Sequence, residues 1–365
     1  MPRPRFEVWN QQIANFETKA QACERLGSPM YADLLTRVAE DLKTGGPAVD
    51  VLAGYQDEPG PAALALRLMG SVHRLVLARQ AGALAAFYPS VGGVFEPESA
   101  WPHFRQLLAD KPEQVREWLD RPPQTNEVGR SAALYGGLHV LAQTIGLPLR
   151  LMEIGSSGGL NLRCDHYAYV DSLGEVHGDP DSPVRLGWKG RQLSGPAPRI
   201  TQRVGSDVAP IDVTTTEGRL ALTAYVWPDQ HDRHERLRGA FAIAGRVPAE
   251  VRTQDAASFV DHLELREGQV TVLAHSVMWQ YLPTQDQQRI TDRLAALGAK
   301  ATATTPLAHL RAEPMRPTPD ADHEFLVALT TWPADPGQAG LDQAQPTRRI
   351  IGELPPHGTP ATWYD

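Results

Sequence analysis

Between residues 6 and 146, apolar side chains recur at the three- and four-residue spacing of amphipathic helices. The two longest sets are Phe6, Trp9, Ile13, Phe16 and Ala20, and Tyr31, Leu34, Leu35, Val38 and Leu42. Gly45-Gly46-Pro47 interrupts the pattern, and further helices are expected over residues 62–84 and 101–119. We therefore predict an all-helical domain over residues 1–123, ending at the boundary signal Arg121-Pro122-Pro123.

One more helix is expected before the pattern changes. It begins at Thr125 or Asn126, both good N-cap residues, and ends at Gly146 ahead of Pro148. After it, short apolar runs alternate with helical segments, which is typical of an α/β sheet. The expected strands cover residues 149–154, 199–204, 250–253, 270–274, 302–307, 325–330 and 349–353. The expected helices cover residues 218–226, 229–244 and 284–297.

Residues 165–198 interrupt this alternation with short polar and apolar stretches separated by Gly and Pro. We interpret the segment as a β-hairpin insertion rather than as part of a helical crossover. The second predicted domain therefore spans residues 124–365 and carries an insertion at about residues 165–198.

The composition excludes several classes of protein. The 365 residues suffice for about two domains, and the formal charge of −8, with no basic block longer than Arg348-Arg349, argues against duplex nucleic acid as the main partner. The N-terminus lacks the apolar core of a signal peptide, and no run of about 18 apolar residues predicts a membrane span. Cys23 and Cys164 lack metal-ligand spacing. We expect a cytoplasmic protein.

His231-Asp232-Arg233-His234-Glu235 could be drawn as a metal-binding pair. Two His residues three positions apart on a polar helix face, without a third ligand nearby in the sequence, are more typical of surface residues. We therefore expect no metal there, and we expect Asp229 to be a helix N-cap.

The segment EIGSSGGLN, residues 153–161, lies between an apolar run and a stretch that can be helical. It lacks the G-x-G-x-x-G of a nicotinamide-binding turn and the Gly-Lys-Ser/Thr of a phosphate-binding loop. Gly155-x-Ser157-x-Gly159 does match a serine hydrolase elbow. However, several strands should precede that nucleophile, and the upstream chain is helical. Nothing in the sequence selects Asp255 with His275 or His309 as its partners.

An S-adenosylmethionine site explains more of the same segment. Small residues bring the backbone against the cofactor, and the positive end of a following helix suits the methionine carboxylate. An acid after the second strand can accept the ribose hydroxyls, and an acid or amide after the third can accept the adenine amino group. Glu153, two residues before Gly155, is expected only in this interpretation.

From about residue 149 onward the chain resembles the Rossmann-like class I S-adenosylmethionine-dependent methyltransferases. Those enzymes have five parallel strands followed by a reversed hairpin. The segments TNEVGRSAAL, EIGSSGGLNLRCDHY, YVWPDQ and HSVMWQYLP more closely resemble the uncharacterised bacterial family called domain of unknown function 2332, over nearly the whole chain. That family has no established activity. The resemblance implies a seven-stranded, Rossmann-like methyltransferase-type α/β domain preceded by the helical one.

The resemblance also implies which residues form the site. The first motif supplies Glu153, Gly155, Ser156, Ser157, Gly159 and Asn161. Asp207 is the favoured ribose acid, although it lies more than 50 residues after the loop where about 20 is usual; Asp171 and Asp212 remain alternatives. The adenine position is assigned to Asp255 and Ala256, and the end of the fourth strand to His275 and Ser276. The residues expected to contact the acceptor or the methionine carboxylate are Asn126, Glu127, Arg130, Trp279 and Tyr281.

The predicted function is therefore methyl transfer from S-adenosylmethionine to a small molecule, with His275 as the candidate base. A structural role fits most of these residues as well, because glycines can simply relieve a turn and Asp255 can cap a helix. The alternative is a ligand-binding or regulatory protein that keeps the fold without the reaction. The sequence names neither the acceptor nor the oligomeric state.

Overall fold

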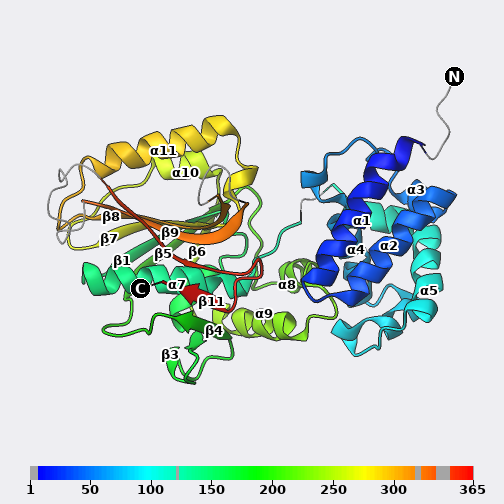
Figure 1. Ribbon diagram of the computed structural model, residues 1–365, viewed down its shortest axis with the longest axis horizontal. Coiled ribbons are helices and arrows are strands. Elements are labelled where there is room, and N and C mark those ends of the chain that lie inside the picture. Colours follow the sequence, from blue (N-terminus) through cyan, green and yellow to red (C-terminus); the bar gives the residue numbers. More distant parts are fainter. Residues whose placement is uncertain (1–6, 121–122, 317–321, 334–345, 365) are drawn as a thin grey trace. The chain divides into compact units, whose positions relative to one another are not determined.

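The computed structural model describes residues 7–120, 123–316, 322–333 and 346–364. The chain forms two compact units, shown in Figure 1: Met1–Thr125 with Thr215–Glu235, and Asn126–Thr214 with Arg236–Asp365. Phe6 and most of the expected boundary signal, Arg121-Pro122, lie outside the described residues. Within the described ranges, no helix is long and apolar enough to cross a membrane.

The first unit is helical, as its periodicity predicts. Its α-helices are α1 (Asn10–Arg25), α2 (Pro29–Thr44), α3 (Pro47–Val51), α4 (Leu64–Leu77), α5 (Pro97–Asp110), α6 (Pro112–Arg116) and α8 (Thr216–Ala224). Short 3-10 turns connect several of them: η1 (Glu7–Trp9), η2 (Gly60–Ala62), η3 (Gly82–Phe87) and η4 (Pro89–Val91). Phe16, Leu35 and Val38 are fully buried in its core. The break predicted after α2 is confirmed, because Gly45 takes a left-handed conformation that caps the helix.

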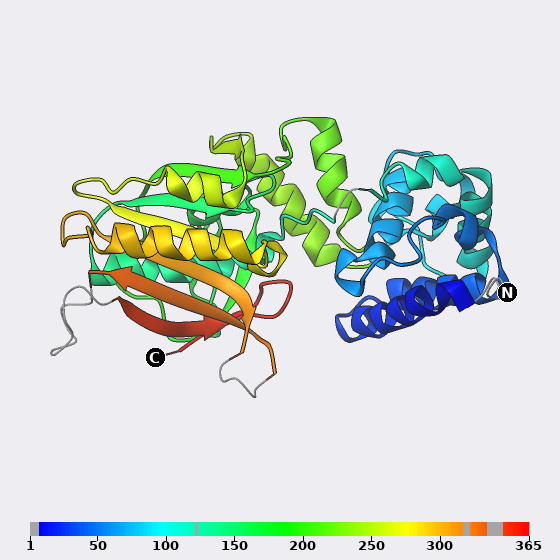
Figure 2. The same cartoon turned by 90° about the horizontal axis from the view of Figure 1, so that it is seen from above.

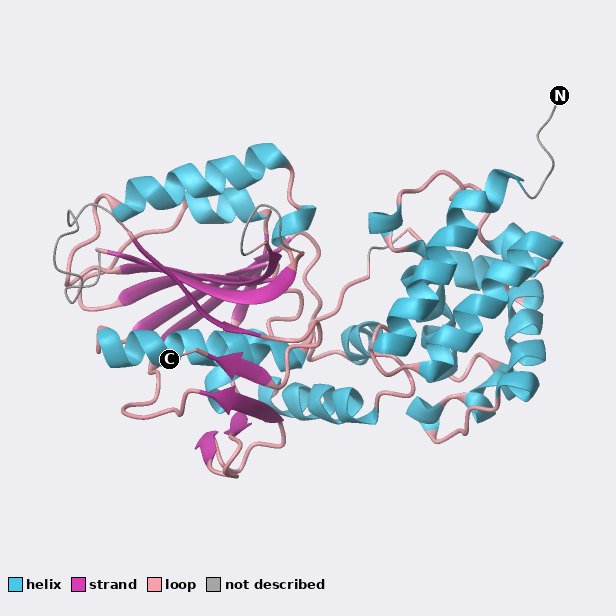
Figure 3. Ribbon diagram, in the orientation of Figure 1, coloured by secondary structure: helices cyan, strands magenta, loops and turns pink. Residues whose placement is uncertain are grey.

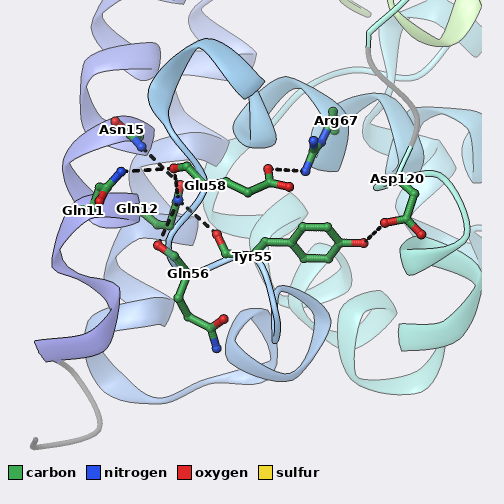
Figure 4. A network of polar contacts seen from close by, with 8 residues as sticks. All are labelled: Gln11, Gln12, Asn15, Tyr55, Gln56, Glu58, Arg67 and Asp120. Atoms are coloured by element: carbon green, nitrogen blue, oxygen red, sulfur yellow. Dashed lines mark hydrogen bonds and ion pairs between the residues drawn. The ribbon is translucent and has the colours of Figure 1, made fainter.

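A polar network fixes the irregular segment between α3 and α4 (Figure 4). The side-chain amide of Gln12 donates to the backbone oxygens of Tyr55, Gln56 and Glu58 at 3.1, 3.1 and 2.8 Å. The Glu58 carboxylate then pairs with Arg67 at 2.6 Å. These bonds satisfy backbone carbonyls that no helix satisfies, so the segment is ordered without regular structure.

Residues Thr215–Glu235 belong to the first unit although their sequence pattern is continuous with the sheet domain. A Cβ on Gly70 of α4 would lie 2.5 Å from the Tyr225 ring, so the glycine allows this close packing. Asp229 is indeed a cap, but it caps α2: its oxygens accept from the Ser28 hydroxyl at 2.6 Å and the Met30 N–H at 3.1 Å.

The expectation that both residues of the His231/His234 pair lie on the surface is wrong. His231 is exposed, whereas His234 is buried and its Nε2 lies 3.1 Å from the Trp227 carbonyl oxygen. The helix that carries both residues, α9 (His231–Ala244), therefore has a buried side that includes His234, although its sequence suggests a polar helix.

The second unit contains a mixed sheet (Figure 3), one end of which is built from parallel strands. Its five parallel strands are β1 (Leu149–Ile154), β5 (Ile200–Asp207), β6 (Glu250–Thr253), β7 (Val270–Ser276) and β8 (Leu307–Met315), in the spatial order β6-β5-β1-β7-β8. The chain adds β5 and β6 on one side of β1 and then returns to add β7 on the other. This reversal creates a topological switch point between β1 and β7, where α/β proteins bind ligands beyond the carboxyl ends of the strands.

Over the part of the chain that the structure describes, the sheet has eleven strands rather than the predicted seven. The six others are β2 (Ala168–Val170), β3 (Val176–Gly178), β4 (Arg185–Gly190), β9 (Glu324–Trp332), β10 (Thr347–Glu353) and β11 (Ala361–Trp363). The insertion is not a simple hairpin, because β2 pairs with β3 antiparallel and with β4 parallel, and β4 then pairs with β11. Both β8/β9 and β9/β10 are antiparallel. The strands of the insertion and the C-terminal strands thus lie together, at the end of the sheet opposite β6.

Helices cover both faces of the parallel strands (Figure 1). α10 (Ala256–Asp261) and α11 (Thr284–Gly298) bury Leu273 and Leu307 on one face, and α11 runs along the sheet in Figure 2. On the other face lies α7 (Ser131–Thr144), where Gly137 packs closely on Leu310. The expected strand over residues 302–307 is wrong, because β8 begins only at Leu307.

Gly136 of α7 provides a test of this packing. Alanine in a helix interior normally stabilises by about 1 kcal/mol relative to glycine, but a Cβ here would lie 1.9 Å from the Trp363 ring. We expect Gly136→Ala to lower the free energy of unfolding by about 1–3 kcal/mol, measured by urea titration. In the control Gly245→Ala, the new Cβ would lie 3.6 Å from the Ala242 carbonyl oxygen, an ordinary contact, and the change should stay within about 0.5 kcal/mol. A higher midpoint for Gly136→Ala would contradict the packing.

Candidate functional site

The glycine turn follows β1 at the switch point. Gly155 and Gly159 both have φ of +66°, and Ser157 between them has φ of +52°, which is unfavourable for a residue with a Cβ. The turn is buried except at Gly155, which is exposed. The backbone therefore bends sharply at the end of β1 and presents Gly155 at the carboxyl edge.

Asp207, the last residue of β5, holds this turn in place. Its Oδ2 accepts a hydrogen bond from the Ser157 N–H at 2.9 Å, and its Oδ1 accepts from the Ala209 N–H at 2.9 Å. The Ser156 N–H also donates to the Ser206 carbonyl oxygen at 3.1 Å. A carboxylate accepting backbone N–H groups forms charge-assisted bonds, which are stronger than neutral ones. The strained Ser157 is thus tied to the neighbouring strand.

The segment before α7 supports the turn from the other side. Asn126 Oδ1 accepts from the Leu160 N–H at 2.8 Å, and the Asn161 amide donates to the Glu127 carbonyl oxygen at 3.4 Å. The N-cap of α7 is Arg130 rather than the expected Thr125 or Asn126. Glu127 caps the preceding 3-10 helix η5 (Val128–Arg130), where its carboxylate accepts from the Gly129 N–H. Arg130, half-buried, ends η5. Asn126, Glu127 and Asn161 therefore lie against the glycine loop.

The expected helix after the turn is absent. Its place is taken by η6 (Asn161–His166), a six-residue 3-10 helix, and the chain then enters β2. So short a segment offers little of the dipole that was expected to attract a methionine carboxylate. Arg163 of η6 instead donates to the Gly159 carbonyl oxygen at 2.6 Å.

Glu153 lies beneath the turn and is 2% exposed. Within the described part of the chain, its Oε2 is buried and has no hydrogen-bond partner. Burial raises the pKa of Glu153 to about 8, with a smaller upward contribution from Asp207 and an opposing one from Arg163. A buried carboxyl oxygen without a donor is costly, so the position is suited to receive a donor from a ligand.

The three candidate ribose acids occupy different environments. Asp207 adjoins the glycine turn at the end of β5. Asp171 accepts from the Leu173 and Glu175 N–H groups in the turn between β2 and β3, and exposed Asp212 accepts from Thr214 in the loop after β5. Asp207 is therefore the candidate whose carboxylate bonds directly to the glycine turn.

Asp255 follows β6 and caps α10, accepting from the Ser258 N–H at 2.8 Å. That hydrogen bond holds the pKa of its carboxyl below the usual range. Its neighbour Ala256 is buried. The Gln254 N–H donates to the Asp207 carbonyl oxygen, which joins the ends of β5 and β6. The cap role is thus established, and the adenine role stays a prediction.

His275 is fully buried near the end of β7. Its Nδ1 lies 2.7 Å from Glu313 Oε1, and its Nε2 lies 3.0 Å from His309 Nε2. Burial holds the pKa of His309 well below its usual value, so that ring is neutral. Both ring nitrogens of His275 are therefore engaged. Its role as a base stays a prediction that requires the His309 contact to break.

Glu153 and His275 lie on opposite faces of the sheet. Glu153 pairs with Ala274 between β1 and β7, and paired residues share a face while the next residue points the other way. The two residues of the predicted site that carry the most chemistry therefore approach the carboxyl edge from different sides.

The loop after β7 reaches the glycine turn. A Cβ on Gly155 would lie 3.0 Å from Met278, so the Met278 side chain packs on the exposed glycine. Trp279, in η7 (Trp279–Tyr281), is half-buried and stacks on His275 with ring centroids 5.1 Å apart. Ser276 is half-buried, and Tyr281 is 65% exposed. Met278 and Trp279 are thus adjacent to the edge, whereas Tyr281 faces solvent.

Sequence reasoning missed Glu313 and Arg163, and it considered His309 only as a partner of the hydrolase serine. His309 and Glu313 lie on β8, in a stretch that was expected to follow the strand rather than to form it. The alternation of His309, Arg311 and Glu313 with apolar Ala308, Leu310 and Ala312 was the available signal for a strand with one polar face.

The hydrolase interpretation lacks its base. The Ser157 hydroxyl is buried and has no hydrogen-bond partner among the described residues. A serine nucleophile needs an imidazole within hydrogen-bond reach.

Comparison with family models matches the chain to a family. A family described as "Uncharacterized protein conserved in bacteria (DUF2332)" matches residues 14–363, which include nearly all of both units. No curated protein and no solved structure matches the chain.

The raised pKa of Glu153 predicts a pH-dependent stability. Between its ordinary value of 4.5 and about 8, the folded state holds a proton that the unfolded state has lost, so the free energy of unfolding should fall as pH rises through this range. The expected loss is on the order of a few kcal/mol. Glu153→Gln should remove that part of the slope in urea titrations between pH 5 and 8, using about five pH values.

The control for this experiment is Glu250→Gln. Glu250 pairs with Arg252 on the exposed surface, which holds its pKa below the usual value, so its titration lies outside the window. If Glu153→Gln and wild type show the same slope, the buried carboxyl does not titrate as described.

Proposed function

Because the chain belongs to DUF2332, a bacterial family whose description assigns no activity, we propose a function from its own geometry. The second unit binds S-adenosylmethionine at the carboxyl edge of β1 and β5 and transfers its methyl group to a small-molecule acceptor. The proposal rests on one arrangement: a buried carboxyl and a strand-end carboxylate flank a left-handed turn at the switch point.

Glu153 and Asp207 suit the polar groups of such a ligand. The unpartnered Glu153 oxygen can accept a hydrogen bond from an ammonium or hydroxyl donor. Binding a cation beside it favours loss of the Glu153 proton, because a nearby positive charge lowers a carboxyl pKa. Asp207 lies on the ribose side of the expected site, next to Gly155–Ser157.

S-adenosylmethionine supplies an activated methyl group on a positively charged sulfonium. The protein needs to align the acceptor with that methyl and to exclude water. Met278 and Trp279, held against the edge by the loop after β7, suit that task. Where the acceptor has a proton to lose, His275 is the candidate to take it at Nε2, with Nδ1 held by Glu313.

The alternative is a binding protein that keeps the fold without methyl transfer. The packing favours it in one respect: Gly155 accommodates Met278, and Gly159 accommodates Val251, with Cβ distances of 3.0 and 2.7 Å. Both glycines are thus explained by protein contacts, and no ligand is needed to account for them.

Titration calorimetry with S-adenosylmethionine and S-adenosylhomocysteine tests the proposal. We expect both to bind, with Kd in the micromolar range, about −8 kcal/mol. Absence of heat with both ligands, for protein shown to be folded by circular dichroism, would remove the cofactor from the proposal. Labelling by a serine-reactive phosphonate that disappears in Ser157→Ala would instead favour the hydrolase.

A pair of aspartates separates the ribose contact from general charge effects. Asp207→Asn should weaken S-adenosylhomocysteine binding by about 1–3 kcal/mol, because it removes a charged acceptor beside the turn. Asp212→Asn, in the loop after β5 where the carboxylate accepts from Thr214, should change the affinity by less than about 0.5 kcal/mol. Equal effects of the two substitutions on Kd would contradict the assignment of Asp207.

A further inference from the structure

The loop after β7 contains the second strained turn of this unit. Val277 has φ of +50°, a left-handed conformation that is particularly unfavourable for a β-branched residue. Among the described non-glycine residues of the second unit, positive φ occurs at Ser157 and Val277, which follow the two strands that flank the switch point. Such strain persists only where the surroundings determine the backbone.

Glu313 supplies that constraint. Its Oε1 accepts from the Met278 N–H at 3.1 Å and the Trp279 N–H at 3.3 Å. Successive N–H groups at a left-handed turn form a concave anion site, and here the anion is the carboxylate of the neighbouring strand. Glu313 is 4% exposed, so these bonds form away from bulk water.

The same oxygen sets the orientation of two rings. Because Oε1 already accepts two backbone N–H groups, it carries no proton, and His275 Nδ1–H must be the donor in the 2.7 Å contact. That bond fixes the imidazole, on which Trp279 stacks with an interplanar angle of 16°. One carboxylate thereby determines the backbone of Met278 and the plane of Trp279.

The consequence extends to the glycine turn, because Met278 packs on Gly155. We propose that Glu313 is a positioning residue of the site: by holding the Val277–Trp279 turn, it sets the wall that Met278 and Trp279 present to a ligand between β1 and β7. The identity of the ligand rests on the proposed function. The hold of Glu313 on the Val277–Trp279 turn, called the clamp below, does not.

The clamp is tested in the full-length protein with Glu313→Gln, which keeps the shape and removes the charge. Neutral hydrogen bonds are roughly half as strong as charge-assisted ones. We expect the amide protons of Met278 and Trp279 to exchange at least about tenfold faster than in wild type. We also expect the protected Nδ1–H proton of His275 to lose its far-downfield NMR resonance. Unchanged exchange at both amides would overturn the clamp.

Asp171→Asn is the matched control. Asp171 also accepts two backbone N–H groups, from Leu173 and Glu175, and also faces a histidine, His177, but it does so in the turn between β2 and β3. It should accelerate exchange at its own turn and leave Met278, Trp279 and the His275 resonance unchanged. Equal acceleration at Met278 and Trp279 in both variants would show a general loss of stability and would overturn the inference.

A second variant guards against misfolding of Glu313→Gln. Glycine accepts a left-handed φ without strain, so Val277→Gly reduces the need for a clamp. In the Val277→Gly background, Glu313→Gln should accelerate exchange at Met278 less than it does in the native background. An equal or larger acceleration would count against a carboxylate that holds a strained turn.

Ligand binding completes the test. Glu313→Gln should raise the Kd for S-adenosylhomocysteine about tenfold, while Asp171→Asn leaves it unchanged. An unchanged Kd in Glu313→Gln overturns the positioning role. If wild type binds no S-adenosylhomocysteine, the cofactor proposal fails, and the clamp is judged by amide exchange alone.

Discussion

The carboxyl edge of the second unit depends on carboxylates that hold strained turns. Asp207 of β5 accepts from Ser157 after β1, and Glu313 of β8 accepts from the two residues after Val277 at the end of β7. In both cases the acid comes from the adjacent parallel strand and offsets an unfavourable left-handed φ. Each of these bonds ties its turn to the neighbouring strand. The geometry of the edge is therefore a property of neighbouring strands.

The acids at this edge differ in whether backbone N–H groups already use them, and that difference bears on function. Asp207, Asp255 and Glu313 all accept backbone N–H groups, so a structural role already accounts for part of each. Glu153 and Glu313 each have a buried Oε2 without a donor among the described residues, but Glu313 also holds a turn through its Oε1. A buried polar atom left in that state is the stronger indication of a ligand. For this reason Glu153 carries more of the functional argument than the glycines that first identified the motif.

The sequence predicted the elements whose signal is local. β1 and β6 begin and end where their patterns indicate, and the helical first unit follows its apolar spacing. Prediction from the sequence failed for elements that depend on contacts with residues far away along the chain. β8 was placed too early because the polar residues His309, Arg311 and Glu313 on one face resemble a loop. β2, β3 and β11 have only three residues each, and β4 lies in the segment that the sequence indicated only as a hairpin insertion. The absent helix after the glycine turn could not be foreseen, since η6 is held by contacts with distant residues such as that of Arg163 with the Val247 carbonyl oxygen.

By itself, the sequence determined the helical character of the first part, the α/β character of the second and the position of the glycine turn. It also showed which residues follow β1, β5, β6 and β7. Only the tertiary structure decided how those residues are used. Ser157 and Asp207 are separated by 50 positions, and His275 and Glu313 by 38. The residues of each pair meet because β1 pairs with β5 and β7 pairs with β8. Apolar periodicity records which residues are buried, because burial follows the local repeat of a helix or strand. It does not record which distant carboxylate meets which N–H group, because that depends on the order in which parallel strands assemble.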